Sequence, residues 1–222
     1  DIFLGDCQAV ADRAVRFGMD ATRIEIFPWG VDLDHFSPSK AQQAGKTWRR
    51  ALGWEDEFVV LCNRTWAPLY GVDLLARAFV KAAVQAPKLR LLLAGDGPQA
   101  DQIHGILSPV EERVDFLGWL AREDLPVVYG AADLYVSPSH CDGSSISLLE
   151  ALACGCPALV SDIPANREWV VPGEVGALFK DREVESLISQ MITMVSDTNL
   201  TAYGRRARVL AGARADWDQN FR

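Results

Sequence analysis

The sequence predicts an α/β fold, a Rossmann-like parallel sheet covered by helices on both faces, and two patterns carry this prediction. Short segments are apolar at successive positions, which is typical of strands buried on both faces. They alternate with longer segments whose apolar residues recur at helical spacing. Strands joined by helices pair in parallel, so this alternation favours one sheet with the helices packed on its faces.

The expected elements follow one another from about residue 57. A first strand is expected at residues 58–62, and the helix expected at residues 72–86 carries Val72, Leu75 and Phe79 on one face. Further strands are expected at residues 89–95, 113–118, 133–138, 157–161 and 176–179, and residues 182–215 again show helical spacing. The order strand, helix, strand therefore repeats over most of the chain.

The two ends of the chain lie outside this alternation. Residues 1–26 have the pattern of a short strand-and-helix unit, and Pro28, Gly30 and Pro38 punctuate the connector that follows. We expect three parts. Residues 1–39 are the end of a preceding domain with its connector, residues 40–205 are the Rossmann-like domain, and residues 206–222 are a helical tail.

Composition and charge restrict the class of protein. Of the 222 residues, 49% are hydrophobic and 23% are charged, as in globular proteins. The net charge of -8, without a dense tract of Lys and Arg, argues against nucleic acid as a partner. No apolar run approaches the roughly 20 residues that span a bilayer, and the first ten residues do not have the pattern of a signal peptide. We therefore expect a cytoplasmic protein.

The five cysteines are expected to be buried, reduced thiols. Cys7, Cys62, Cys141, Cys154 and Cys156 form no CxxC pair and lie in apolar or strand-like surroundings. The three histidines do not supply further ligands at metal-binding spacing. We expect neither a metal nor another cofactor.

Three loops qualify as a ligand site, because ligands of open parallel sheets bind outside the carboxyl ends of the strands. Arg64 follows the first expected strand, and Gly95 and Gly97 follow the second. The loop at residues 137–147 leads into the helix that holds Glu150. All three loops are expected to border one crevice.

The residue types in these loops suit a sugar linked to a diphosphate. Gly143, Ser144 and Ser145 would leave backbone N–H groups open to an anion where the helix begins, and Arg64 would add a fixed cation. Carboxylates repel phosphate, so Asp142 and Glu150 are better suited to accept hydrogen bonds from sugar hydroxyls.

Simpler interpretations exist for some of these residues. Arg64 alone could be an ion-paired loop residue, and the Gly-Asp-Gly sequence at residues 95–97 could be an ordinary turn. Asp142 could serve only as a helix N-cap. Tyr70 fits a packing role as well as a place in the site. Glu150 is harder to explain structurally, because it interrupts the apolar stretch ISLLEALA.

Six segments carry a resemblance to a known family. They read FPWGVDLDHFSP, RTWAPLYGVDLLARAF, LRLLLAGDGPQADQI, VDFLGWL, YGAADLYVSPS and DGSSISLLEALACGCPALVSD. Their order and spacing resemble the C-terminal domain of family-four retaining glycosyltransferases of the GT-B fold over nearly the whole chain. The resemblance implies the C-terminal half of a GT-B fold, in which this domain holds most of the nucleotide-sugar donor.

The resemblance also implies a role for each matching residue. Arg64 would contact the donor diphosphate and Asp142 the transferred sugar, and these two are the expected catalytic residues. Glu150 would bind the ribose hydroxyls. The other expected substrate-binding residues are Tyr70, Gly95, Gly97, Leu117, Gly118, Gly143, Ser144, Ser145, Ile146 and Ser147.

The sequence departs from the family pattern at three places. Asp142 replaces the usual Glu, and Ser144 and Ser145 stand where Phe-Gly is frequent. Tyr70 stands where a Lys commonly helps to neutralise the diphosphate. These departures affect the contacts to the sugar and to the diphosphate.

The implied function is transfer of a sugar from a nucleoside diphosphate sugar to a hydroxyl of a glycan, a lipid-linked acceptor or a small molecule. The family resemblance implies retention of configuration by front-face displacement, with no obligatory metal. The acceptor would be held by the N-terminal domain, and any membrane contact would be peripheral, at the inner face and through that domain. The alternatives are a GT-B-type nucleotide-sugar epimerase and a non-catalytic nucleotide-binding or assembly module.

Overall fold

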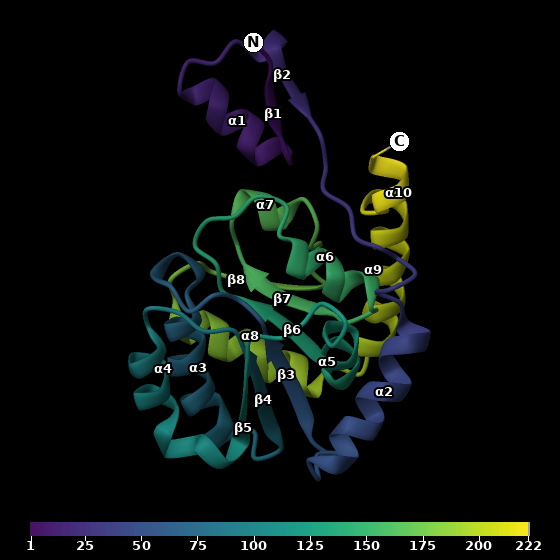
Figure 1. The fold of residues 1–222 in the computed structure, drawn as a ribbon. Coiled ribbons are helices and arrows are strands. Elements are labelled where there is room, and N and C mark those ends of the chain that lie inside the picture. Colours follow the sequence, from purple (N-terminus) through teal and green to yellow (C-terminus); the bar gives the residue numbers. More distant parts are fainter. Residues whose placement is uncertain (222) are drawn as a thin grey trace.

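A six-stranded parallel sheet forms the centre of the computed structural model, which describes residues 1–221 (Figure 1). The strand order is β5-β4-β3-β6-β7-β8. The chain adds β4 and β5 on one side of β3 and then returns to place β6 on its other side, so the order reverses between β3 and β6. The strands are β3 (Phe58–Cys62), β4 (Leu89–Ala94), β5 (Val114–Gly118), β6 (Leu134–Ser137), β7 (Ala158–Ser161) and β8 (Gly176–Phe179).

Helices cover both faces of the sheet because the strands are apolar on both faces. In β3, Val60 and Cys62 pack into one core cluster, while Val59 and Leu61 pack into the other. The first cluster includes side chains of α3 (Val72–Gln85), α4 (Ala100–Leu107) and α8 (Val184–Ser196). The second includes side chains of α2 (Pro38–Ala51), α5 (Leu125–Ala131), α6 (Ile146–Ala153) and α9 (Leu200–Arg214).

The predicted fold class is confirmed, and each predicted strand is present with ends that differ by one residue at most. The helical spacing at residues 182–215 corresponds to α8 and α9, with a break between them. The shorter elements are α7 (Pro164–Arg167), α10 (Trp217–Asn220), η1 (Ala21–Arg23), η2 (Pro68–Tyr70) and η3 (Ser108–Arg113).

The expected domain limits fall inside helices. The limit at 39/40 lies in α2, and the limit at 205/206 lies in α9. Ala207 and Ala211 of α9 are buried in the second core cluster, and a Cβ on Gly204 would lie 2.2 Å from the carbonyl oxygen of Gly155. The helix α9 therefore packs as part of the main domain.

A small unit precedes the main domain and lies above it in Figure 1. It consists of the parallel pair β1 (Phe3–Gly5) and β2 (Ile24–Ile26) with α1 (Gln8–Arg16) between them in the chain. Residues 27–37 then connect this unit to α2, running beside α10. Contacts between this unit and the loop before α6 are described below.

Four of the five cysteines are buried, as predicted, but Cys141 is exposed. The reason is its place in the loop between β6 and α6, outside the sheet core, where Arg13 Nη1 lies 3.7 Å from its sulfur. Burial raises the pKa of the Cys62 thiol to about 11 and that of Cys154 to about 12. Within residues 1–221, no His, Cys, Asp and Glu side chains cluster in a way that could hold a metal ion.

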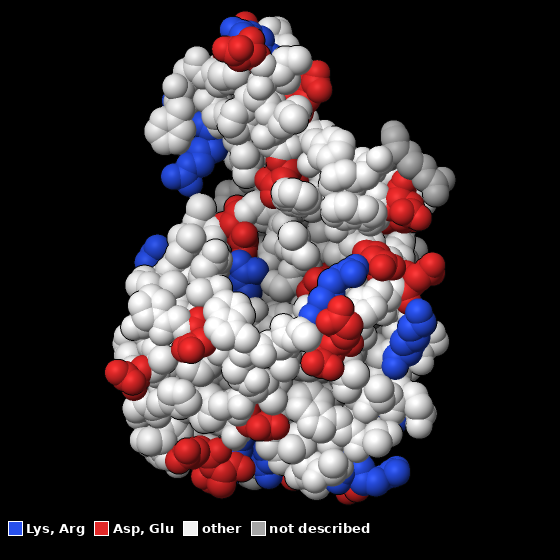
Figure 2. Space-filling model, viewed as in Figure 1, with Lys and Arg blue, Asp and Glu red and all other residues white. Residues whose placement is uncertain are grey.

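The surface carries mixed charge. Figure 2 shows acidic and basic side chains interspersed over the visible face, without a broad field of Lys and Arg. None of the helices in the described part of the chain is both long and apolar enough to cross a membrane.

Candidate functional site

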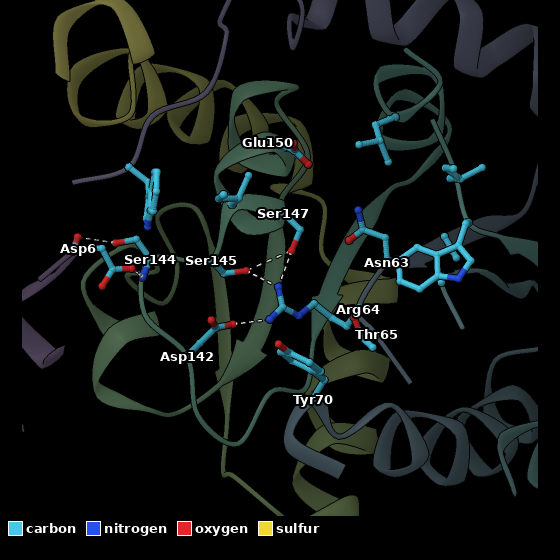
Figure 3. Close-up of a pocket in the computed structure, with 17 residues that line it drawn as sticks. Asp6, Asn63, Arg64, Thr65, Tyr70, Asp142, Ser144, Ser145, Ser147 and Glu150 are labelled. Carbon is cyan, nitrogen blue, oxygen red and sulfur yellow. Dashed lines mark hydrogen bonds and ion pairs between the residues drawn. The ribbon is translucent and has the colours of Figure 1, made fainter. Parts of the chain in front are cut away.

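A cavity of about 520 Å³ opens at the carboxyl ends of the central strands, where the strand order reverses. Figure 2 shows the surface hollowed below the small N-terminal unit, and Figure 3 shows the lining side chains. All three loops predicted to border a crevice contribute to it. The lining residues are Asp6, Trp29, Asn63, Arg64, Thr65, Tyr70, Ala94, Gly95, Trp119, Leu120, Leu125, Asp142, Ser144, Ser145, Ile146, Ser147 and Glu150.

Arg64 lies at the centre of the polar contacts in this cavity (Figure 3). Its Nη1 donates to the hydroxyls of Ser145 at 2.7 Å and Ser147 at 2.8 Å, and its Nη2 donates to Asp142 Oδ2 at 2.6 Å. The side chain is 12% exposed. Its Nε is buried and has no hydrogen-bond partner among the described residues. Three of the five guanidinium N–H groups make these contacts, so the side chain is fixed at the entrance of α6.

Tyr70 packs against this guanidinium. The Arg64 Cζ lies 4.6 Å from the centre of the Tyr70 ring, within the range of a cation–π interaction. Tyr70 also lines the cavity. Tyr70, at the position where the family usually has Lys, therefore packs against Arg64 and adds no second positive charge.

If the cavity holds the nucleoside diphosphate that the family resemblance implies, replacing Tyr70 by Ala is expected to weaken its binding about 5- to 30-fold, because a desolvated cation–π contact contributes roughly 1 to 2 kcal/mol to the placement of Arg64. Titration calorimetry with UDP and GDP checks this. Tyr70→Phe keeps the ring face and should bind like the wild type. Equal losses in both variants would show that the hydroxyl, and not the ring face, supports the site.

Glu150 projects from α6 into the cavity, and it is 8% exposed. Tyr129 donates its hydroxyl hydrogen to Glu150 Oε2 at 2.8 Å, and Asn63 Nδ2 donates to the same hydroxyl oxygen at 2.8 Å. Burial raises the pKa of Glu150 to about 7, while the hydrogen bond from Tyr129 opposes the rise. Burying an acid in an otherwise apolar helix face lowers stability, and acids with such raised pKa values are frequent at functional sites, so Glu150 is a candidate ligand-binding residue.

Two glycines allow the loops to approach one another. Gly95 adopts a φ of +99°, and a Cβ there would lie 2.8 Å from the carbonyl oxygen of Arg64. A Cβ on Gly97 would lie 2.5 Å from the carbonyl oxygen of Trp66. Gly95 lines the cavity, whereas Gly97 packs behind it against the backbone of Trp66. The Gly-Asp-Gly segment therefore allows close packing against the loop at residues 64–66, which an ordinary turn would not require.

The structure brings most of the predicted site residues together. Four of them do not line the cavity, namely Gly97, Leu117, Gly118 and Gly143. Leu117 and Gly118 end β5, and the next two residues, Trp119 and Leu120, line the cavity in their place. The predicted contact of Leu117 and Gly118 with the base of the nucleotide stays a prediction.

Asp142 does not serve as the N-cap of α6. The N-cap position is Ser145, and the Asp142 carboxylate instead accepts hydrogen bonds from Arg64 and from the backbone N–H of Gly143 at 3.1 Å. Burial raises the pKa of Asp142, while Arg64 opposes the rise. Arg64 is ion-paired, as the simpler interpretation proposed, but the pair lies in the wall of the cavity.

Several lining residues were missed from the sequence. Asn63 and Trp119 directly follow the ends of β3 and β5, so their positions after predicted strands could have identified them. Asp6 and Trp29 come from the small unit and the connector. No local pattern places those two residues beside Arg64.

The sheet, the reversal of strand order and the cavity at that point define a Rossmann-like ligand-binding domain. Residues 45–209 match the model of the family described as glycosyl transferases group 1, and the chain belongs to this family.

Three relatives show how far the similarity extends. The chain is 28% identical over 211 residues to a GDP-mannose-dependent phosphatidylinositol monomannoside mannosyltransferase of Corynebacterium glutamicum, covering 91% of this chain and 55% of that protein. It is 36% identical over 177 residues to a D-inositol 3-phosphate glycosyltransferase of a Mycobacterium species, covering 74% of this chain and 38% of that protein. The Anabaena HepE protein, crystallised with UDP and glucose, superimposes with a TM-score of 0.87 at 25% identity, covering 99% of this chain and 60% of that one.

The chain thus spans 55% of the length of the mannosyltransferase and 38% of the inositol phosphate glycosyltransferase. The similarity to HepE extends beyond the main domain to nearly all of the chain, so it includes the small N-terminal unit. The GT-B type of fold that the sequence implied is confirmed by this match.

Proposed function

We propose that this chain is the donor-binding domain of a retaining glycosyltransferase, which moves a sugar from a nucleoside diphosphate sugar to an acceptor hydroxyl. The observation that carries the proposal is the placement of Arg64 against the entrance of α6, with Glu150 in the same cavity. The relatives named above transfer sugars according to their names, and HepE was crystallised with UDP and glucose. These names support a nucleotide-sugar donor over an epimerase or an assembly module.

The geometry suggests how the donor is oriented. A diphosphate would lie against Arg64 and the N–H groups at the start of α6, since both favour negative charge. Glu150, about one turn into α6, would accept hydrogen bonds from the ribose hydroxyls. The transferred sugar would then lie toward Asp142, on the opposite side of Arg64.

The proposed reaction follows from this placement. The bond between the anomeric carbon and the phosphate oxygen breaks while the acceptor oxygen bonds to the same face of that carbon. The proton of the acceptor hydroxyl passes to the departing diphosphate. Arg64 stabilises the charge that develops on the leaving group, which lowers the barrier only to the extent that the contact strengthens in the transition state.

We also propose that the acceptor is a glycan, a lipid-linked molecule or a small molecule with a free hydroxyl. The protein is cytoplasmic in this proposal, and any contact with a membrane is peripheral. The five cysteines are free thiols, as is usual in a reducing compartment. The acceptors of the relatives include lipid and inositol derivatives according to their names.

A binding panel tests the proposal. The chain is titrated with UDP, GDP and ADP and with UDP-glucose and GDP-mannose, and at least one nucleotide is expected to bind. Failure of every nucleotide to bind would overturn the proposal. For the full-length protein, NMR of the product is expected to show the anomeric configuration of the donor, and an inverted product would contradict the retaining mechanism.

A further inference from the structure

Asp6 belongs to the small N-terminal unit but reaches into the cavity of the main domain (Figure 3). It directly follows β1, and its Oδ2 accepts a hydrogen bond of 2.8 Å from the backbone N–H of Ser144. The Ser144 hydroxyl in turn donates to the carbonyl oxygen of Asp6 at 3.0 Å. Asp6 is therefore hydrogen-bonded to one of the backbone N–H groups in the loop that leads into α6, so this N–H group already has a partner.

A second carboxylate makes the reciprocal contact. Glu168, directly after α7 in the main domain, accepts hydrogen bonds from the backbone N–H groups of Gln8 at 3.1 Å and Ala9 at 2.8 Å, at the start of α1. Each part thus supplies a carboxylate to backbone N–H groups of the other. The two contacts are separate, because Asp6 lies in the lining of the cavity whereas Glu168 lies outside it.

The Asp6 carboxylate leaves no space for a side chain at Gly143. A Cβ on Gly143 would lie 2.3 Å from Asp6 Oδ2 and 2.7 Å from Oδ1. The sequence suggested that the small side chains of this turn leave room for a phosphate. The structure fills the space beside Gly143 with a carboxylate instead, and phosphate is repelled there.

The cavity is therefore electrostatically divided. Arg64 favours anions on one side, whereas Asp6 and Asp142 flank the Gly143–Ser144 segment with negative charge. An uncharged group rich in hydroxyl donors is the chemistry that suits two carboxylate acceptors. In a nucleoside diphosphate sugar, that group is the transferred sugar.

We propose that Asp6 is a sugar-binding residue: it accepts a hydrogen bond from a hydroxyl of the transferred sugar, on a segment that precedes the donor-binding domain. This inference rests on the proposed function, because it assumes that the donor diphosphate lies against Arg64. It assigns to the small unit a direct part in binding the sugar, in addition to its structural contacts.

The test compares each nucleotide with its sugar-bearing form. The ratio of the dissociation constants of UDP and UDP-glucose, or of GDP and GDP-mannose, measures what the sugar adds to binding. Asp6→Asn can still accept from Ser144 through its carbonyl oxygen, but it replaces the other acceptor by a donor. We expect Asp6→Asn to lower this ratio about 10-fold, since a hydrogen bond to a charged group is lost, and to leave the affinity for the free nucleotide within about 2-fold.

Glu168→Gln is the matched control. It weakens the reciprocal contact between the two parts but lies outside the lining of the donor cavity, so its ratio should equal that of the wild type. Gly143→Ala is a second test. It leaves the charge of Asp6 unchanged, but the added Cβ displaces the Asp6 carboxylate from its position beside the cavity. It should lower the ratio in the same direction as Asp6→Asn.

The outcomes separate the two proposals. If free nucleotide binds, three results overturn the role of Asp6. They are an unchanged ratio in Asp6→Asn, an equal fall of the ratio in Glu168→Gln, and a ratio of one in the wild type. If no nucleotide binds the wild-type chain, the proposed function fails and the inference fails with it.

Discussion

Replacing Arg64 by Ala is expected to lower the affinity for nucleoside diphosphates about 100-fold or more. Arg64 provides the fixed positive charge at the entrance of α6, and each charge-assisted hydrogen bond to a phosphate contributes roughly 1.5 to 3 kcal/mol. The variant also leaves the carboxylate of Asp142, 18% exposed, without its cation. Electrostatic repulsion between this carboxylate and the diphosphate adds to the loss. Titration calorimetry with UDP and GDP measures it.

Two variants serve as controls. Arg64→Lys keeps the charge but not the planar fork that contacts Asp142 and both serines, so an intermediate affinity is expected. Arg90→Ala removes a similarly buried arginine, paired with Glu57 at 3.1 Å and located in the first half of β4, away from the cavity. It should cost stability without changing nucleotide affinity. Equal affinity losses in Arg64→Ala and Arg90→Ala would contradict the assignment of Arg64.

Glu150→Gln is expected to stabilise the protein at pH 8 by about 3 kcal/mol and to change its stability little near pH 5. The pKa of Glu150 is raised from 4.5 to about 7 in the folded chain, mainly by burial. The folded state therefore binds the proton more tightly than the unfolded state does. The stability that this proton contributes is present below pH 4.5 and is lost as the pH rises through about 7. Gln stays neutral at every pH, so the variant avoids this loss.

Urea unfolding at pH 5 and pH 8 measures the difference in the free energy of unfolding. Glu185→Gln is the control, because this exposed acid, paired with Lys81 at the surface, should change stability by less than about 1 kcal/mol at either pH. A Glu150→Gln variant that is less stable than the wild type at pH 8 would show that the charged carboxylate is well compensated in the fold.

The same variant should lose affinity for nucleotides while it gains stability. One of the two carboxylate acceptors is replaced by a donor, and the ribose hydroxyls prefer acceptors. A residue that lowers stability above pH 7 but is needed for binding is typical of a functional site, where stability and function conflict. Higher stability together with unchanged nucleotide binding would leave Glu150 without the role assigned to it.

The strands could be located from the sequence because each of them is buried on both faces of the sheet, which requires apolar residues at consecutive positions. Residues 58–62 are apolar at successive positions, and this pattern is typical of strands that contact helices on both sides. Once the strands are placed in parallel, their carboxyl ends share one edge, so Arg64, Gly95 and Glu150 could be grouped without coordinates. The contacts that orient these side chains could not be predicted in the same way.

Asp6 illustrates what a local pattern cannot show. Its partner Ser144 lies 138 residues further along the chain, and neither periodicity nor a motif links the two. The interaction of Tyr70 with Arg64 depends on the short helical turn η2, which sets the direction of the ring. Cys141 was wrongly expected to be buried because its neighbours in sequence are not its neighbours in space.

The sequence by itself determined the α/β class, the strands and the three loops that meet at one edge, because burial and turn chemistry act on consecutive residues. Only the tertiary structure decided which side chains enter the cavity and how they are paired. Folding brings together the segments that place Asp142 beside Arg64 and Asp6 beside Gly143, and it buries Glu150, which raises the pKa of this acid. Hydrogen bonding and desolvation depend on distance in space, and the linear order of residues does not specify that distance.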